Sequence, residues 1–228
     1  MKKNTLNSVH LDGFLEGFRV TQSSPEEAFA WASVVTLHPK PEAAIGGLSA
    51  GDKYEYLHHD IRIEADDEEG VSHLRSVKNS FESLRDSAEL YPCSVNGMLK
   101  AENDNSFVSC KVENFRRMDF VKTNDNNIAN IEGEISSVVI GRTHANMRIR
   151  LSEGVFDVFV SQKDNPDIWK SVSGGEVKKG DVMYMNGPLL SQRLTDGDKV
   201  LKMSAISPHH VQKRQLDKRI RKKGSQSI

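Results

Sequence analysis

The chain has 228 residues, of which 37% are hydrophobic and 28% charged, with a formal net charge of −1. No hydrophobic run approaches the ~18 residues of a membrane-spanning helix, and residues 4–10 are polar where a signal peptide would be hydrophobic. We therefore expect a globular protein in the cytoplasm.

The charge is unevenly distributed along the chain. Residues 213–228 carry seven lysines and arginines against one acid, so this tail is +6 and the rest of the chain is −7. The two cysteines, Cys93 and Cys110, lie in strand-like segments without a Cys-x-x-Cys spacing. Two buried thiols are therefore favoured over a disulfide.

The first half of the chain begins with a strand pattern. Strands are predicted over Val9–Leu15 and Ala28–Leu37, followed by a glycine-containing loop over residues 41–53. A third strand is predicted over Tyr54–Glu64, with one face formed by Leu57, His59, Ile61 and Ile63.

A helix is predicted next, over Ser72–Leu90, because hydrophobic residues recur there at spacings of three and four. Ser72 is the expected N-cap, and Asp66–Glu69 before it is interpreted as a solvated acidic loop rather than a metal site. Strands return at Cys93–Leu99 and at Val108–Val112.

The second half repeats this order in less space, after a polar linker over residues 123–127. Its predicted elements are three strands, a short helix and two more strands, over Ile128–Ile140, Asn146–Leu151, Val155–Gln162, Pro166–Val172, Val182–Leu190 and Lys199–Ile206. Residues 195–198 form the expected hairpin turn between the last two strands.

Short motifs also occur twice. Asn96-Gly97-Met98-Leu99 and Asn186-Gly187-Pro188-Leu189 share the pattern Asn-Gly-x-Leu, and an asparagine precedes a glycine by six positions in both Asn7–Gly13 and Asn127–Gly133. A glycine within a strand marks a bend or a close backbone approach, as at the corner of a small barrel. The repetition favours two units of roughly 100 residues each.

Five strands with a helix between the third and fourth is the order of the OB fold. The sequence therefore predicts a mainly β protein with two tandem OB-fold barrels, each a five-stranded Greek key. The expected domains are residues 4–122 and 127–211, followed by a basic tail over residues 212–228. This barrel hosts many unrelated activities, so function must be argued from particular residues.

The motifs resemble those of bacterial single-stranded DNA-binding proteins. Asn7–Leu15 is similar to the family's first strand, Asn-x-Val-x-Leu-x-Gly-x-Leu, at every named position, and Lys179–Leu189 resembles its fourth strand. The resemblance covers residues 4–121 and 127–211 and implies the variant with two OB folds per chain. It also implies single-stranded DNA as the partner and, because four OB folds usually assemble in that family, a homodimer.

Two features depart from the family pattern. Family members commonly end in an acidic tail with a Pro-Phe tip that recruits repair and replication proteins, whereas this chain ends in the basic segment Arg221–Ile228. Recruitment of partners by that route is therefore not expected. The second repeat has Ala129 and Ile131 where the first-strand pattern has Val and Leu, so its assignment depends on the fourth strand.

Binding an unpaired strand requires cations along the backbone and flat side chains under the bases, where stacking contributes about 1–3 kcal/mol per base. Strand alternation indicates which side chains point outward. The resulting candidates are Trp31, Tyr56, His58, Arg62, Phe107 and Lys111 in the first repeat and Arg148, Arg150 and Phe159 in the second. Phe115, Arg116 and Arg117 are added because they place an aromatic residue beside two cations.

Several candidates have a second interpretation. Trp31 points outward if Ala30 and Ala32 face the core. If Phe29 faces the core instead, Trp31 is a core residue as well. Arg148 and Arg150 suit phosphate contacts or a merely solvated barrel face. An outward Phe159 indicates either stacking or a subunit interface.

Other residues leave similar alternatives. Phe115-Arg116-Arg117 suits nucleic-acid binding or an ordinary barrel edge, and Trp169 is predicted to plug the second barrel rather than stack on a base. The basic tail either adds affinity for phosphates or is a solvated end. Because eleven of the fifteen aromatic residues precede the linker, we expect the first repeat to contribute more stacking.

Catalytic patterns are not found in the sequence. The pairs His58-His59 and His209-His210 are adjacent, and neighbouring strand residues point to opposite sides. No phosphate-binding glycine loop, nucleophile elbow or metal-spaced cysteine set occurs, so no enzyme activity, metal or cofactor is expected.

The leading hypothesis is a protein that coats single-stranded DNA during replication, repair or transfer of a mobile element. The alternative is a protein-interaction or assembly module on the same barrels, such as a primosome-type accessory factor or a structural subunit, with little affinity for nucleic acid.

Overall fold

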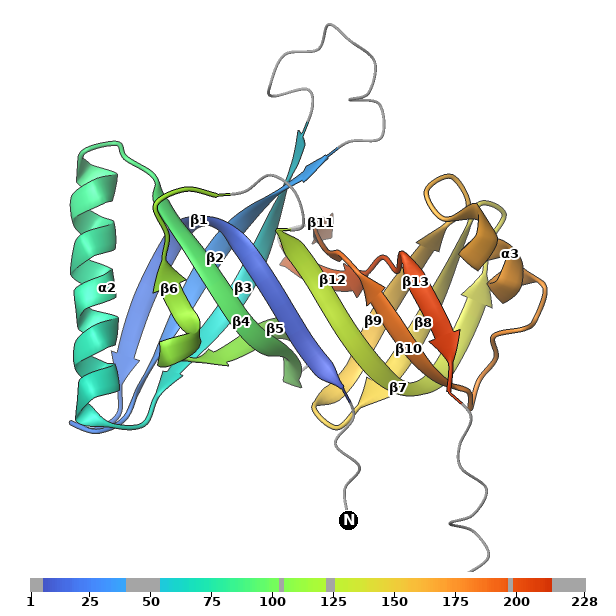
Figure 1. The fold of residues 1–228 in the computed structure, drawn as a ribbon, viewed down its shortest axis with the longest axis horizontal. Helices are drawn as coiled ribbons and strands as arrows, with labels where there is room; N and C mark the ends of the chain where they lie inside the picture. Colours follow the sequence, from blue (N-terminus) through green and yellow to red (C-terminus); the bar gives the residue numbers. More distant parts are fainter. Residues whose placement is uncertain (1–5, 40–53, 103–104, 122–125, 197–198, 215–228) are drawn as a thin grey trace, which may run out of the picture.

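The computed structural model describes residues 6–39, 54–102, 105–121, 126–196 and 199–214 (Figure 1). The loop expected at residues 41–53 and most of the expected linker and basic tail lie outside these residues. None of the described helices has the length and hydrophobicity needed to cross a membrane.

The first barrel contains β1 to β6 and helix α2. Its elements are β1 (Asn7–Gln22), β2 (Ala28–Pro39), β3 (Tyr54–Ala65), α2 (Glu68–Asp86), β4 (Tyr91–Glu102), β5 (Asn105–Lys111), the 3-10 helix η2 (Val112–Asn114) and β6 (Phe115–Arg117). Strand β1 pairs with β2 and with β4, β2 pairs with β3, β3 pairs in parallel with β5, and β5 pairs with β4. The barrel is therefore closed in the order β1-β2-β3-β5-β4, as the OB fold requires.

The second barrel repeats this topology. Its elements are β7 (Asn127–Ile140), β8 (His144–Leu151), β9 (Gly154–Ser161), α3 (Pro166–Ser173), β10 (Val182–Gly187), β11 (Leu189–Asp196), β12 (Lys199–Ile206) and β13 (His210–Lys213). Strand β9 pairs in parallel with β12, as β3 does with β5. The prediction of two tandem OB folds is confirmed.

One predicted strand of the second barrel is wrong in its extent. The segment Val182–Leu190 was expected as a single strand, but the structure divides it at Pro188 into β10 and β11. Proline has no backbone N–H to continue the strand ladder. Together β10 and β11 take the place of β4 in the first barrel.

The predicted start of the first helix is also wrong. Helix α2 begins at Glu68, and the Asp67 carboxylate accepts a hydrogen bond of 2.6 Å from the Gly70 N–H, so Asp67 and not Ser72 is the N-cap. The predicted range began after Gly70 and Val71, although both residues are buried. The acidic residues before it start the helix, because carboxylates are stabilised near a helix N-terminus.

The repeated asparagine of each first strand bridges the repeated leucine of each fourth strand. Asn7 donates through Nδ2 to the Leu99 carbonyl and accepts through Oδ1 from the Leu99 N–H, both at 2.9 Å. Asn127 makes the same two bonds with Leu189, at 2.8 and 2.9 Å. The asparagine of the first strand and the leucine of the fourth strand therefore recur together in both repeats, because their hydrogen bonds join these two strands of each barrel.

The two barrels share a continuous sheet. Strand β1 pairs antiparallel with β7, from Asn7 opposite Ile131 to Leu11 opposite Asn127, so the described strands form one 13-stranded sheet (Figure 1). Asn127, which was expected at the end of the linker, is a buried residue at the start of β7. Helices α2 and α3 lie at opposite ends of the molecule (Figure 1).

Candidate nucleic-acid interface

The outer face of β1, β2 and β3 carries an aromatic side chain between two arginines. Ala30 and Ala32 are buried in the core, so Trp31 points outward with 38% of its surface exposed. Of the two arrangements that the sequence allowed for Trp31, the structure has the outward one. Arg19 lies opposite Trp31 on β1 and Arg62 lies opposite it on β3, so Arg19, Trp31 and Arg62 form one row across the sheet, hereafter the Trp31 row.

The guanidinium of Arg62 is held in place by its neighbours. Its Cζ lies 4.9 Å from the centre of the Phe29 ring. Arg62 Nε lies 3.5 Å from Glu64 Oε1, and Arg62 Nη1 lies 3.5 Å from Glu102 Oε1. These contacts orient the guanidinium and offset much of its charge.

Tyr56 lies on the same outer face, near the other end of β3, and is 57% exposed. It precedes Arg62 by six residues, which corresponds to about 20 Å along a strand. Between them, His58 Nδ1 lies 2.9 Å from Glu16 Oε2. Tyr56 and the Trp31 row therefore lie on one face, but they are separated by several residues along the strand.

Two aromatic candidates are buried, so the prediction that Phe107 is exposed is wrong, and Phe115 is part of an ordinary barrel strand rather than a surface ring. Phe107 is only 4% exposed, and its ring packs edge-to-face on Trp31 at a centroid distance of 5.1 Å. Phe115 is 1% exposed and lies in the core near Phe18. The 3-10 helix η2 interrupts the strand before Phe115, so strand alternation cannot be extended through it.

Lys111 and Arg116 are exposed but engaged in local contacts. Lys111 Nζ lies 2.8 Å from Asp66 Oδ2, and this hydrogen bond raises the pKa of Lys111 and lowers that of Asp66. Arg116 Nε donates to the Glu113 carbonyl at 3.3 Å. Neither residue belongs to the Trp31 row.

The outer face of β8 and β9 carries the second group of candidates. Arg148 and Arg150 alternate with the buried Met147 and Ile149, so both point outward. Arg148 Nε lies 3.1 Å from Asp157 Oδ1 on β9, and the Arg148 side chain is 64% exposed. Arg150 is exposed and has no ion pair among the described residues.

Phe159 lies on the same face of β9 as Asp157 and is partly exposed. Its ring stacks on that of His144 at a centroid distance of 5.6 Å and an interplanar angle of 25°. Asn146 on β8 pairs with Phe159 on one side and with Val139 of β7 on the other, so the three residues form one row across the strands. Val139 is 63% exposed. The face therefore combines cations, a stacked ring pair and an exposed aliphatic side chain.

Sequence reasoning missed Arg19, His144 and Val139. Strand β1 was expected to end at Leu15, but it continues to Gln22 through a bulge between Leu15 and Gly17. A similar bulge lies between Ile135 and Ser137 on β7. A bulge changes the alternation of a strand, so the outward positions beyond it could not be assigned from periodicity alone.

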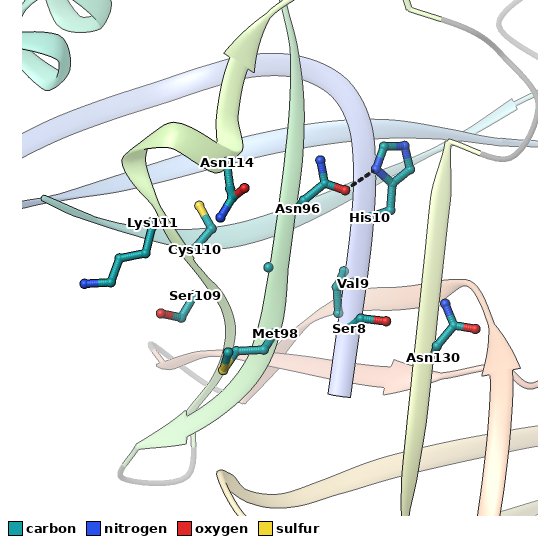
Figure 2. Close-up of a pocket in the computed structure, with 11 residues that line it drawn as sticks. Ser8, Val9, His10, Asn96, Met98, Ser109, Cys110, Lys111, Asn114 and Asn130 are labelled. Carbon is teal, nitrogen blue, oxygen red and sulfur yellow. Dashed lines mark hydrogen bonds between the residues drawn. The ribbon is translucent and has the colours of Figure 1, made fainter. Parts of the chain in front are cut away.

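A pocket lies farther around the first barrel, where β1, β4, β5 and β7 meet (Figure 2). Figure 2 shows His10 of β1 and Asn96 of β4 joined by a hydrogen bond of 2.9 Å, with Asn130 of β7 on the far side of β1. The only sequence-predicted candidate among its described lining residues is Lys111. The candidate interface is therefore the pair of strand faces and not this pocket.

The buried thiols offer no reactive group. Cys93 and Cys110 are free and buried, as predicted, and burial raises the pKa of both, that of Cys110 to about 12. Such thiols are poor nucleophiles near neutral pH. Among the described residues, no cluster of three or more His, Cys, Asp or Glu side chains could hold a metal ion.

Comparison with solved structures finds a protein of the same architecture. The single-stranded DNA-binding protein from Thermus aquaticus superposes with a TM-score of 0.62 and 14% sequence identity, over 93% of this chain and 95% of that one. A deletion mutant of that protein gives a TM-score of 0.58 at 14% identity, over 94% and 97% of the two chains. The likeness establishes a shared two-barrel fold. No family model and no curated protein sequence matches the chain.

Proposed function

We propose that this protein coats single-stranded DNA with little sequence preference, during replication, repair or transfer of a mobile element. The observation that carries the proposal is that both barrels place an aromatic ring and arginines on one outer strand face: Trp31 is in register with Arg19 and Arg62, and the partly exposed Phe159 shares its face with Arg148 and Arg150. Base stacking on aromatic side chains tolerates any sequence, because every base has a π face. The fold shared with the Thermus aquaticus protein supports the proposal.

The charge of the chain restricts how such binding works. Without the basic tail the chain carries −7, so attraction to DNA must come from locally placed cations. The ion pair between Arg148 and Asp157 lies on the surface, where such a pair contributes about 0–1 kcal/mol. A phosphate can therefore take the place of Asp157 at little cost.

Titration of the full chain with poly-dT at two salt concentrations tests the proposal. We expect binding at low salt and a loss of affinity as salt rises, because bound cations displace counterions from the DNA. Replacing both Arg148 and Arg150 with Gln should lower the log–log salt slope by about 1.4, since each phosphate contact to a single strand contributes about 0.7.

The control is Arg85→Gln, which removes an exposed arginine from helix α2 rather than from a strand face. It should leave the salt slope unchanged. Absence of poly-dT binding by the unmodified chain at low salt would contradict the proposed function.

Exposed aliphatic side chains favour a second candidate function, a protein-interaction or assembly module. Val139 and Ile140 are 63% and 51% exposed at the end of β7, next to the β7–β8 turn. Adjacent exposed aliphatic residues are a common feature of protein contact sites. The poly-dT titration separates the two candidates, because an assembly module would bind the oligonucleotide weakly or not at all.

We also propose that the chain forms a homodimer and so brings four OB folds together. The family resemblance of the first and fourth strands supports this proposal. Light scattering coupled to size-exclusion chromatography should give twice the 25.5 kDa mass of the chain. A mass of one chain across the micromolar range would refute it.

A further inference from the structure

The Trp31 row places a tryptophan in register between two arginines on neighbouring strands. Arg19 is in register with Trp31, and Trp31 is in register with Arg62. Adjacent strands lie about 4.8 Å apart, so the backbone of the row spans about 10 Å. A base stacked on the indole would therefore lie between two strands that each carry an arginine in register with Trp31.

The indole of Trp31 is also supported from one side. The Phe107 ring meets it edge-to-face, with a centroid distance of 5.1 Å and an interplanar angle of 73°. Phe107 is 4% exposed whereas Trp31 is 38% exposed, so the supporting ring is covered and the indole is open to solvent. An edge-to-face contact of this kind restricts the plane of the indole.

The two arginines of the row differ in their available charge. Arg62 lies over the Phe29 ring and close to Glu64 and Glu102, which offset its charge. Arg19 is exposed and has no ion pair or hydrogen bond from its side chain among the described residues. Arg19 is thus the cation of the row that is available to a phosphate.

We propose that Arg19, Trp31 and Phe107 form a single-nucleotide subsite on the first barrel. Trp31 stacks on the base, Arg19 contacts the adjacent phosphate, and Phe107 is a positioning residue that fixes the plane of the indole without touching the DNA. The subsite rests on the proposed function, and it adds a phosphate contact at Arg19 and a supporting role for Phe107.

The first test uses a Trp169→Phe background, in which Trp31 is the only tryptophan. The Trp169 Nε1 atom is buried and has no hydrogen-bond partner within the described part of the chain, so phenylalanine is a mild replacement there. Poly-dT should quench the Trp31 emission. In this background Trp31→Ala, followed by anisotropy of labelled poly-dT, should weaken binding about 5- to 150-fold.

The phosphate contact is tested by Arg19→Gln. This variant should lower the salt slope by about 0.7, the contribution of one phosphate on a single strand. Arg85→Gln, on helix α2, is the matched control and should leave the slope and the quenching unchanged.

The positioning role is tested by Phe107→Leu. In the free protein this change should shift the Trp31 emission to longer wavelength, and it should reduce the quenching at saturating poly-dT. The control is Phe81→Leu, which also removes a buried ring from an edge-to-face pair, with Tyr91 at 6.3 Å. Phe81 lies on α2, so its loss should lower stability without moving the Trp31 spectrum.

The outcomes separate the subsite from the proposed function. If the Trp169→Phe protein and the unmodified chain both fail to bind poly-dT, the proposed function is wrong and the subsite with it. If they bind but Trp31 emission does not change and Arg19→Gln keeps the full salt slope, the protein binds DNA elsewhere and only the subsite is wrong.

Discussion

At the scale of single residues, the two adjacent histidines of β3 have opposite environments. His58 points outward, with Nδ1 2.9 Å from Glu16 Oε2. His59 is 1% exposed, and its Nε2 lies 2.9 Å from the Thr36 hydroxyl, while Nδ1 has no partner among the described residues. Burial lowers the pKa of His59 from 6.5 to about 3, so the core contains a neutral imidazole.

This arrangement predicts a loss of stability in mild acid. Above pH 6.5 neither the folded nor the unfolded state protonates His59, so its burial carries no charge penalty. As the pH falls from 6.5 towards about 3, only the unfolded state binds the proton, and the free energy of unfolding should decrease by up to about 1.4 kcal/mol per pH unit. Urea unfolding at pH 7 and pH 5 measures this difference.

Variants at the two positions identify the residue responsible. His59→Gln keeps a polar group near Thr36 but cannot titrate, so its stability should depend less on pH. His58→Gln is the control and should keep the dependence of the unmodified chain. The same pH dependence in His59→Gln and the unmodified chain would show that His59 is not the source.

The side chains also show what strand alternation can predict. It correctly oriented Arg148 and Arg150, because β8 is short and regular between buried Met147 and Ile149. It gave no orientation for Phe115, because η2 breaks the strand before that residue. It could not show the covering of Phe107, since this ring packs against Trp31 from a strand distant in sequence.

At the scale of the elements, the repeated glycines mark places where a neighbouring strand leaves no room for a side chain. A Cβ atom on Gly13 would collide with the Val35 carbonyl oxygen, and one on Gly133 would collide with that of Arg150. These glycines occupy equivalent positions in β1 and β7. The motif could be recognised in the sequence as a barrel corner, because only glycine fits where two backbones approach so closely.

Two glycines of the same strand allow a matched test of this requirement. We expect Gly13→Ala to destabilise the fold by about 1–3 kcal/mol, because backbone atoms must move to admit the methyl group. At Gly17 the atom nearest to an added methyl group would be Ser33 Cβ at 3.8 Å, an ordinary contact. Gly17→Ala should therefore be neutral or stabilise by up to about 1 kcal/mol.

Urea unfolding monitored by circular dichroism measures both variants. Equal stabilities for Gly13→Ala and Gly17→Ala would mean that the close approach of β1 and β2 does not constrain the sequence. An intact barrel with lower stability for Gly13→Ala alone is the expected result.

At the scale of the whole molecule, the connection between the barrels was the least predictable feature. Periodicity and repeats indicate the strands of each barrel, but the pairing of β1 with β7 depends on how the finished barrels meet. No residue type in the sequence indicates the pairing of β1 with β7, since the hydrogen bonds between paired strands join backbone groups. The outward position of Arg19 was equally unpredictable, because it depends on the bulge in β1, which is a feature of backbone geometry and not of residue composition.

Several contacts reinforce the junction between the barrels. The Asp12 N–H donates to the Asn126 carbonyl at 2.7 Å, and the Ala101 N–H donates to the Glu153 carbonyl at 3.1 Å. Asn7 Nδ2 also donates to Glu153 Oε2 at 3.0 Å, so the residue that closes the first barrel also contacts the second. A junction with a shared sheet and these hydrogen bonds should couple the stabilities of the two barrels.

We therefore expect the barrels to unfold together, and the two tryptophans can report this because each lies in a different barrel. Trp31 lies on β2 and Trp169 lies on α3. Urea unfolding of the Trp169→Phe variant follows the first barrel, and that of Trp31→Phe follows the second. Each variant should show a fluorescence midpoint equal to its own circular dichroism midpoint, because a cooperative transition is seen alike by local and global probes. A fluorescence transition that precedes or follows the loss of total β structure in either variant would show that the barrels unfold independently.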